Sequence, residues 1–138
     1  MTPANTASQD KFILVVEDNV LNFVLISRIL GNMGLHCEWK TSGAQVVDIA
    51  NTFPHIDLII MDIRLPYEDG FVALKKLRRS EIHKNVPVVA ITAEASPAQL
   101  EKAKKAGFNG FIGKPIEPDR FTGQITRLLN GEEVWELA

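Results

Sequence analysis

The chain contains one cysteine, Cys37, among its 138 residues, so it cannot form an internal disulfide bond. Small secreted domains are often stapled by several disulfides, whereas such bonds are rare in the reducing cytosol. The lone cysteine therefore favours a cytoplasmic protein. The N-terminus also lacks the basic region followed by an apolar stretch that marks a secretory signal peptide.

Long hydrophobic runs are also missing, and no apolar stretch approaches the roughly 20 residues that a membrane-spanning helix requires. The net charge is only -2, whereas non-specific binding to nucleic acid depends on neutralising phosphates with excess positive charge. No groove-reading motif accompanies the one basic cluster, which we expect to be a solvated helix face. This cluster consists of Lys75, Lys76, Arg78 and Arg79. We therefore expect neither membrane insertion nor direct DNA binding.

Hydrophobic residues make up 46% of the sequence, which is enough for the core of one ordinary domain. We expect this domain to span residues 11–130. A small, polar segment at 1–10 precedes it and is expected to be a disordered tail. Residues 131–138 form a C-terminal tail whose apolar side chains, Val134, Trp135 and Leu137, would pack on the last helix or contact a partner.

Continuously apolar segments alternate with helical patterns along the chain. Segments 12–16, 58–61 and 86–91 are apolar throughout, which is typical of strands buried on both faces. Residues 35–40 alternate between apolar and polar side chains, and the apolar segment 110–112 is short, so we expect both to be edge strands. Capping and stop signals predict helices from about 20 to 33, from Ser42 to before Pro54, from 70 to 80, from 97 to 107 and from 118 to 130.

Strict alternation of strand and helix, repeated five times, predicts an α/β domain with a parallel sheet. With the two weaker strands at the rims, the order becomes the flavodoxin-like, doubly wound 2-1-3-4-5, a five-stranded sheet with five helices. In such a sheet the carboxyl ends of the strands gather at one edge, where ligands bind.

Polar side chains follow the predicted strands at this edge. Glu17 and Asp18 follow the first strand, Asp62 the third, Thr92 the fourth and Lys114 the fifth. Crowded carboxylates repel one another, which raises their pKa values unless a cation joins them. Oxygen ligands with room for water suit Mg²⁺, and the sequence offers no competing cluster of histidine and cysteine. One such carboxylate could simply end a strand, but five polar residues at matching strand ends indicate a site.

Four segments resemble the response regulator receiver domains of two-component signalling. They are VVEDN at 15–19, MDIRLPYEDG at 61–70, ITA at 91–93 and GKP at 113–115. Their order and spacing are similar to those of the family over about residues 11–129. The form VEDNxxN at 16–22 resembles receivers of hybrid kinases and of stand-alone regulators.

The resemblance implies that Asp62 accepts a phosphoryl group from a phosphohistidine and forms an acyl phosphate. It further implies a Mg²⁺ ion held by Asp18, by Asp62 and by the backbone carbonyl of Arg64. Glu17 would act on this ion through a water molecule. Phosphoryl transfer needs an in-line nucleophile and positive charge around the phosphoryl oxygens, which agrees with these roles.

The remaining implied roles belong to residues of the fourth and fifth strands. Lys114 and Thr92 would contact the phosphoryl group, and a cis peptide bond before Pro115 would aim Lys114 into the pocket. In the family, the residue at Thr92 moves toward the phosphoryl group while the aromatic at Phe111 turns inward, so these two would form the switch. Many relatives carry tyrosine there. Phe111 has no hydroxyl to bond outside, so its inward state should cost less.

The resemblance also places Arg64 and Glu94 at the mouth of the pocket. An opposite-charge pair there could hinder the attack of water on the acyl phosphate and so tune its hydrolysis. The alternative is two independent surface charges, because exposed pairs contribute only ~0–1 kcal/mol.

The predicted first helix is too apolar to be a simple amphipathic element. Its non-core side presents an apolar patch beside the acidic pocket. Such a patch suggests docking of the helical bundle that carries the phosphohistidine, in a histidine kinase or a histidine phosphotransfer protein. Scattered exposed apolar residues are the alternative. The patch consists of Val20, Leu21, Phe23 and Val24.

Together these features predict a single-domain response regulator that signals by phosphorylation-dependent protein contacts or by phosphorelay. The contacts would use the face of the fourth helix, the fifth strand and the fifth helix. The chain would be a phosphoacceptor that assists its own phosphorylation and hydrolysis, not an enzyme with a turned-over substrate.

Three alternatives stay open from the sequence. One is a receiver that forms part of a longer hybrid kinase. Another is a phosphatase like the haloacid dehalogenases, which expects a second aspartate two positions after the nucleophile, where this chain has Arg64. The last is a flavodoxin-like nucleotide binder, although no glycine-rich phosphate loop follows the first strand.

Overall fold

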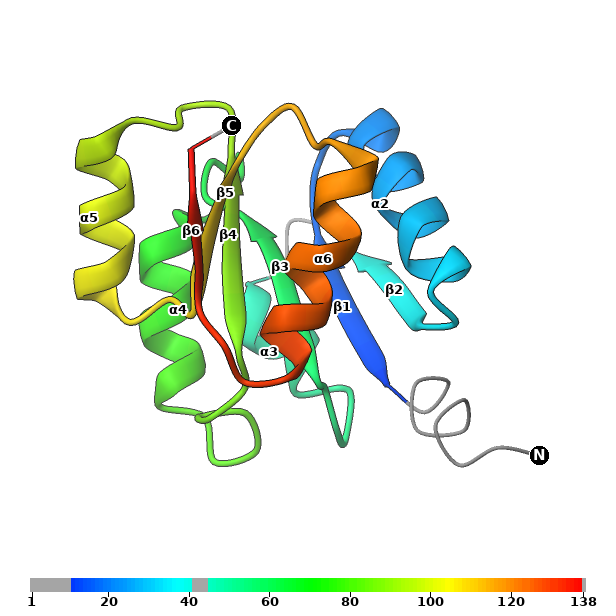
Figure 1. Ribbon diagram of the computed structural model, residues 1–138. Helices are drawn as coiled ribbons and strands as arrows, with labels where there is room; N and C mark the ends of the chain where they lie inside the picture. The colour runs from blue at the N-terminus through cyan, green and yellow to red at the C-terminus, as the bar shows by residue number, and fades with distance from the viewer. Residues whose placement is uncertain (1–10, 41–44, 138) are drawn as a thin grey trace.

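The computed structural model describes residues 11–40 and 45–137 (Figure 1). The predicted tail at 1–10 and the predicted helix start at Ser42 lie outside these residues. Gln45 was expected inside that helix, but its backbone is extended and the helix begins at Val46. The strands are β1 (Phe12–Val16), β2 (His36–Lys40), β3 (Leu58–Asp62), β4 (Val88–Thr92), β5 (Gly110–Gly113) and β6 (Val134–Glu136). The helices are α2 (Val20–Asn32), α3 (Val46–Ala50), α4 (Gly70–Arg78), α5 (Pro97–Ala106) and α6 (Pro118–Leu129).

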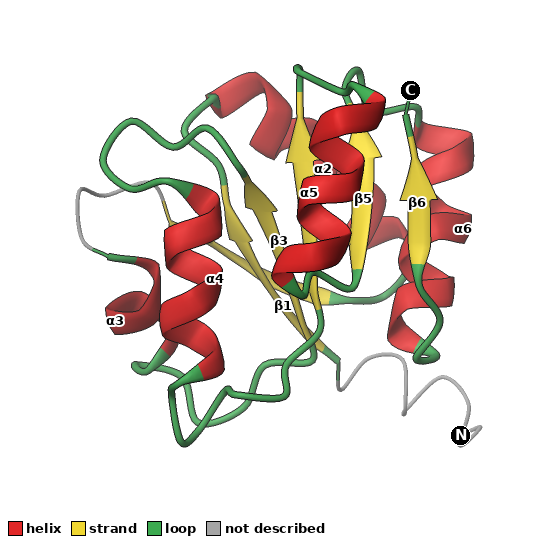
Figure 2. Ribbon diagram, turned by 90° about the vertical axis from the view of Figure 1, so that its left-hand side faces the viewer, coloured by secondary structure: helices red, strands yellow, loops and turns green. Residues whose placement is uncertain are grey.

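All strand pairs are parallel, and the order β2-β1-β3-β4-β5-β6 confirms the predicted doubly wound topology with one strand added. Helices α2 and α6 cover one face of the sheet, and α3, α4 and α5 cover the other (Figures 1 and 2). Successive side chains of a strand enter opposite cores. Ile13 and Val15 pack with α2 and α6, whereas Leu14 and Val16 pack with α3 and α4. This double burial explains why the central strands are apolar throughout.

Helices α2 and α5 have ends that follow the capping chemistry of the sequence. The side chain of Asn19 accepts a hydrogen bond from the backbone N–H of Asn22 and caps α2, and Ser96 caps α5 through the N–H of Gln99. Gly107 ends α5 with a φ of 103°, a left-handed conformation that favours glycine. The cap at Asn19, three residues after the end of β1, fixes the start of α2, so the first turn of this helix lies next to the carboxyl end of that strand.

The predicted C-terminal tail instead contains a sixth strand, so the expectation that the fifth strand lies at an edge is wrong. Strand β6 pairs in parallel with β5, with Trp135 opposite Phe111. A Cβ atom at Gly110 would lie 2.9 Å from the carbonyl oxygen of Val134, so glycine permits this approach. Glu136 accepts hydrogen bonds from Arg120 at 2.8 Å and Gln124 at 2.6 Å, which join β6 to α6. A strand of three residues is too short to show a period in the sequence.

The basic cluster on α4 is more than a solvated face. The guanidinium of Arg78 is partly buried and donates hydrogen bonds to the carbonyl oxygen of Val86 at 2.7 Å and to the side chain of Asn109 at 2.9 Å. Lys76 pairs with the buried carboxylate of Glu68 at 3.1 Å. Arg78 therefore joins α4 to the segments that lead into β4 and β5. Across the described ranges, the structure shows no helix with the length and apolar character needed to cross a membrane.

Candidate functional site

Asp62 lies at the carboxyl end of the central strand β3, and its side chain is buried. One carboxylate oxygen, Oδ1, accepts a hydrogen bond from the backbone N–H of Arg64 at 2.9 Å. The other, Oδ2, lies 2.8 Å from the ammonium nitrogen of Lys114. The turn that follows needs a glycine at Gly70, because a Cβ atom there would lie 2.7 Å from the Cα atom of Ile63. These contacts hold the carboxylate at the edge of the sheet where the strands end.

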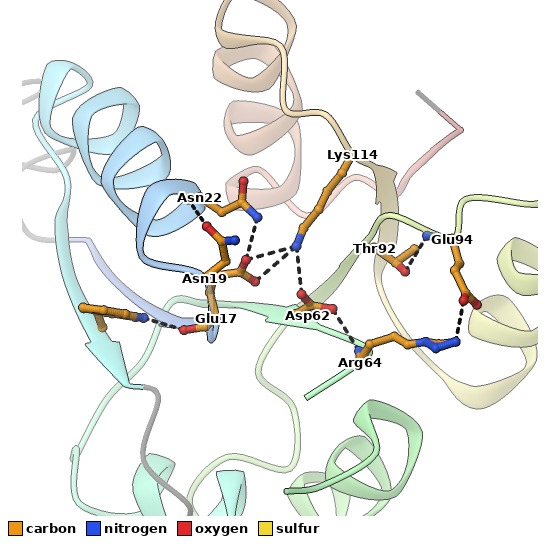
Figure 3. A network of polar contacts seen from close by, with 9 residues as sticks. Glu17, Asn19, Asn22, Asp62, Arg64, Thr92, Glu94 and Lys114 are labelled. Atoms are coloured by element: carbon orange, nitrogen blue, oxygen red, sulfur yellow. Dashed lines mark hydrogen bonds and ion pairs between the residues drawn. The ribbon is translucent and has the colours of Figure 1, made fainter. Parts of the chain in front are cut away.

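Lys114 directly follows β5, and its backbone N–H donates to the carbonyl oxygen of Thr92 at 2.8 Å. The peptide bond between Lys114 and Pro115 is cis, the isomer that the resemblance implied. The lysine side chain extends toward the ends of β1 and β3 (Figure 3). Its ammonium nitrogen lies 3.0 Å from Glu17 Oε1 as well as close to Asp62, so one cation bridges two carboxylates from neighbouring strands.

Glu17, Asp18 and Asp62 form an acidic cluster whose possible ligand atoms all lie within 4.8 Å of one another. Glu17 is fully buried, whereas Asp18 is exposed and opens the cluster to solvent. Burial, together with the nearby carboxyl of Asp62, raises the pKa of Glu17 from 4.5 to about 7. Burial alone would lower the pKa of Lys114, but its contacts with Asp62 and Glu17 raise it, so this lysine is ionised at neutral pH.

The donor set of this cluster fits a hard divalent cation. Three carboxylates converge, one of them exposed, and Mg²⁺ prefers oxygen ligands while keeping several water molecules. Close carboxylates repel one another, and a cation between them removes that repulsion. The cluster could therefore bind a metal ion of this class.

Thr92 ends β4 and is buried beside the cluster. Its hydroxyl oxygen accepts a hydrogen bond from the backbone N–H of Glu94 at 3.0 Å, which leaves the hydroxyl hydrogen available for another acceptor (Figure 3). A hollow of about 220 Å³ opens here. Its lining consists of Asp62, Arg64, Thr92, Ala93, Glu94 and Lys114. The fourth strand thus adds a hydroxyl donor to the lysine and the carboxylates.

Arg64 and Glu94 form an ion pair at the rim of this hollow (Figure 3). Their side chains are 58% and 53% exposed, which is typical of a solvated pair. The two residues that were expected at the pocket mouth therefore contact each other across it.

Phe111 is completely buried in the core beneath α4 and α5. Thr92 and Phe111 come from the adjacent strands β4 and β5, so the two residues of the expected switch belong to neighbouring strands. In this structure the aromatic ring points inward.

The apolar patch on α2 differs from the expectation at one residue. Val20 is 56% exposed, Leu21 80% and Val24 39%, so these three form a solvent-facing apolar patch at the start of the helix. Phe23 is instead half-buried, because its ring stacks on that of Trp39 at 4.5 Å. Phe23 therefore belongs to the interface between α2 and β2, and the patch is smaller than the sequence suggested.

Two residues near the site had no role assigned from the sequence. Asn22 donates a hydrogen bond from its side-chain nitrogen to Glu17 Oε1 at 2.8 Å. The indole N–H of Trp39 donates to the backbone carbonyl of Glu17 at 2.6 Å. Asn22 is the last residue of the VEDNxxN segment, so this segment could have indicated a role for it. Trp39 lies on another strand, and only the fold brings it to Glu17.

The raised pKa of Glu17 predicts that the stability of the cation-free protein depends on pH. Between pH 4.5 and about 7 the folded chain binds a proton at Glu17 that the unfolded chain has lost. This contribution to the free energy of unfolding is fully present below pH 4.5 and is lost as the pH rises through about 7. We expect a loss of up to about 3 kcal/mol.

Urea unfolding in the presence of EDTA, at several pH values from 5 to 8, would measure this loss, with Glu17→Gln as the matched variant. The difference in unfolding free energy between the two proteins should change across this pH range. A constant difference would contradict the assignment.

Comparison with known proteins agrees with this geometry. The family model described as "Response regulator receiver domain" matches residues 13–126. The signal transduction histidine-protein kinase BarA of Escherichia coli strain K12 is 36% identical over 122 residues. The match covers 88% of this chain but only 13% of BarA. The polar-differentiation response regulator DivK of Brucella abortus strain 2308 is 35% identical over 119 residues, which cover 86% of this chain and 96% of DivK.

A solved structure extends the similarity to the fold. The receiver domain of the sensor histidine kinase PA1611 from Pseudomonas aeruginosa PAO1 superposes with a TM-score of 0.77 at 32% identity. The superposition covers 87% of this chain and 98% of that domain, which holds a magnesium ion in its active-site cleft. The match of the family model over most of the chain, together with these relatives, shows that the chain belongs to the response regulator receiver domain family.

Proposed function

We propose that the chain is a phosphoacceptor of two-component signalling and that Asp62 is the residue phosphorylated. The observation that carries the proposal is the ionised Lys114, whose ammonium nitrogen lies 2.8 Å from Asp62 Oδ2. Asp62 is a buried carboxylate at a strand end, and the hollow beside it is open to a substrate. A haloacid-dehalogenase-like phosphatase would need a second aspartate at position 64, where Arg64 instead pairs with Glu94.

In the proposed reaction, a carboxylate oxygen of Asp62 attacks the phosphorus of a phosphohistidine. A P–O bond forms, the P–N bond breaks in line with it, and the electron pair of that bond returns to the imidazole nitrogen. Such a transfer needs little covalent help, because most of the catalysis consists of positioning and positive charge around the phosphoryl oxygens. The ammonium of Lys114 supplies charge, and the hydroxyl of Thr92 donates a hydrogen bond.

The acidic cluster would hold Mg²⁺ in this reaction. Asp18, Asp62 and the backbone carbonyl of Arg64 would bind the ion, and Glu17 would act through water. When bound, the ion supplies positive charge to the phosphoryl oxygens. The convergence of Glu17, Asp18 and Asp62 supports this assignment, as does the magnesium ion in the similar receiver of PA1611.

Phosphorylation would be read out through Thr92 and Phe111. Thr92 would move toward the new phosphoryl group, and this movement would stabilise the inward position that Phe111 already has in this structure. The affected surface is the face of α5, β5 and α6, now extended by β6, and we propose that an output protein binds there. We further propose that the domain acts as a stand-alone regulator or relay intermediate, because it aligns with nearly the whole of DivK. A histidine kinase or a phosphotransfer protein would be the phosphoryl donor.

Intact-mass spectrometry tests the acceptor residue. After incubation with acetyl phosphate and Mg²⁺, the native chain should gain one phosphoryl group, whereas Asp62→Asn should gain none. Asp48→Asn is the matched control, because Asp48 is an exposed residue on α3 outside the site. Equal labelling of the native chain and Asp62→Asn would overturn the proposal, as would labelling that does not require a divalent cation.

The ion pair at the rim of the hollow leads to a prediction about hydrolysis. We propose that the contact between Arg64 and Glu94 hinders the water that attacks the acyl phosphate. Arg64→Ala should then shorten the lifetime of the acyl phosphate by up to about fivefold, since exposed pairs contribute up to ~1 kcal/mol. The decay of the phosphorylated mass after removal of the donor measures this lifetime. Arg79→Ala, which removes an exposed arginine directly after α4, is the control, and an unchanged lifetime in Arg64→Ala would refute the role.

The apolar patch on α2 leads to a prediction about the donor. We propose that Val20, Leu21 and Val24 contact the helical bundle that carries the phosphohistidine. Val24→Glu should slow transfer from a cognate kinase or phosphotransfer protein by about tenfold, because a charge in the centre of an interface is costly. Labelling by acetyl phosphate should stay unchanged.

A matched control is available for this experiment. Val72→Glu introduces the same charge at a valine of α4 that is 47% exposed, close to the 39% of Val24. This variant should change neither the rate of transfer from the protein donor nor the rate of labelling by acetyl phosphate. If Val24→Glu slowed phosphorylation by both donors equally, the patch would be structural and the docking role would be wrong.

A further inference from the structure

Glu17 is held from two sides by residues that lie outside the acidic cluster. Asn22, in the first turn of α2, donates to the carboxylate oxygen Oε1 at 2.8 Å. Trp39, on β2, donates its indole N–H to the backbone carbonyl of the same residue at 2.6 Å. Glu17 is fully buried, whereas Asn22 and Trp39 are half-buried, so both contacts are partly shielded from competing water.

The two contacts constrain different parts of Glu17. Its Oε1 atom also lies 3.0 Å from Lys114, so the oxygen receives one charged and one neutral donor. These donors fix the rotation of the carboxylate. The indole contact fixes the backbone at the point where β1 ends and the chain turns toward α2.

The indole of Trp39 is itself fixed in place. Its strand β2 pairs with β1 so that Trp39 lies opposite Val15, two residues before Glu17. The ring of Phe23 stacks on the indole with centroids 4.5 Å apart and planes 10° from parallel. Offset stacking of this kind orients an aromatic ring as well as burying it. Helix α2 therefore acts on Glu17 directly through Asn22 and indirectly through the stack of Phe23 on Trp39.

We propose that Asn22 and Trp39 are positioning residues of the cation site. Neither would touch the ion, but both hold Glu17 in the orientation from which it reaches the ion through water. Groups that orient a metal ligand commonly change metal affinity by about 10- to 100-fold when they are removed. The effect should fall near the lower end here, because Glu17 acts through water and keeps its contact with Lys114. The inference rests on the proposed function, since it assumes that the acidic cluster binds Mg²⁺.

The same turn of α2 carries the proposed docking patch. Val20, Leu21 and Val24 face solvent, while Asn22 and Phe23 face Glu17 and Trp39. A partner that docks on this turn would therefore contact the element that holds Glu17.

Isothermal titration calorimetry with MgCl₂ at pH 8 tests the proposal on two matched pairs of variants. Asn22→Ala is compared with Asn32→Ala, an exposed asparagine at the other end of the same helix. Trp39→Phe keeps a ring for Phe23 to stack on but removes the N–H, and it is compared with Trp135→Phe on β6. The dissociation constant for Mg²⁺ should rise about tenfold in Asn22→Ala and at least threefold in Trp39→Phe. Both controls should stay within about twofold of the native chain.

Urea unfolding in EDTA separates positioning from stability. A merely structural role would lower the free energy of unfolding and leave the dissociation constant for Mg²⁺ unchanged, and this result would overturn the proposal. Should Trp39→Phe fail to fold, Asn22→Ala decides alone. If the native chain bound no Mg²⁺, the proposed function would fail together with this inference. If the native chain and Asn22→Ala bound Mg²⁺ equally, only this inference would fail.

Discussion

The contact of one ammonium group with two buried carboxylates is the interaction on which this site depends. Glu17 and Asp62 end adjacent strands, and burying both of them without a cation would be costly. The ammonium of Lys114 lies 2.8 Å from Asp62 and 3.0 Å from Glu17, and it offsets much of that cost. The same positive charge then stands where a phosphoryl group on Asp62 would place its oxygens. The stability of the site and the proposed chemistry therefore use the same three side chains.

The parallel sheet delivers these side chains to one place. Strands β1 and β3 are neighbours, so Glu17 and Asp62 end side by side. Thr92 pairs in register with Gly113, and Lys114 is the next residue, so the fourth and fifth strands bring a hydroxyl and an ammonium to the same edge. Each of the four site residues lies at the end of a strand or directly after it. Asn22 and Trp39 add a second set of contacts that hold Glu17 from α2 and β2.

The residues that line the site could largely be predicted from the sequence, because they lie at the ends of strands with a clear apolar pattern. Continuous apolar runs mark the central strands, and the polar residue after each run marks the ligand-binding edge. Asp62, Thr92 and Lys114 follow directly from that rule. The ends of α5 were equally visible, since Ser96 and Gly107 have local capping roles that depend on near neighbours in the chain. The start of α3 was not, because Gln45 was predicted to lie inside that helix and is instead its extended N-cap residue.

The features that the sequence did not reveal depend on contacts between distant segments. Strand β6 is too short for a periodic pattern and forms through its pairing with β5 and through Glu136. Arg78 was expected to be solvated, but its partners Val86 and Asn109 come from other elements. Phe23 is covered by Trp39 from the neighbouring strand. No local pattern in the sequence encodes such pairs.

A crystal structure grown with Mg²⁺ and beryllium fluoride, which mimics a phosphoryl group on a carboxylate, tests the central claim most directly. We expect the beryllium fluoride on a carboxylate oxygen of Asp62, with the Lys114 ammonium about 3 Å from a fluoride. The Mg²⁺ ion should lie against Asp18 and Asp62. Beryllium fluoride bound elsewhere, or a Lys114 side chain turned away from an occupied Asp62, would contradict the account.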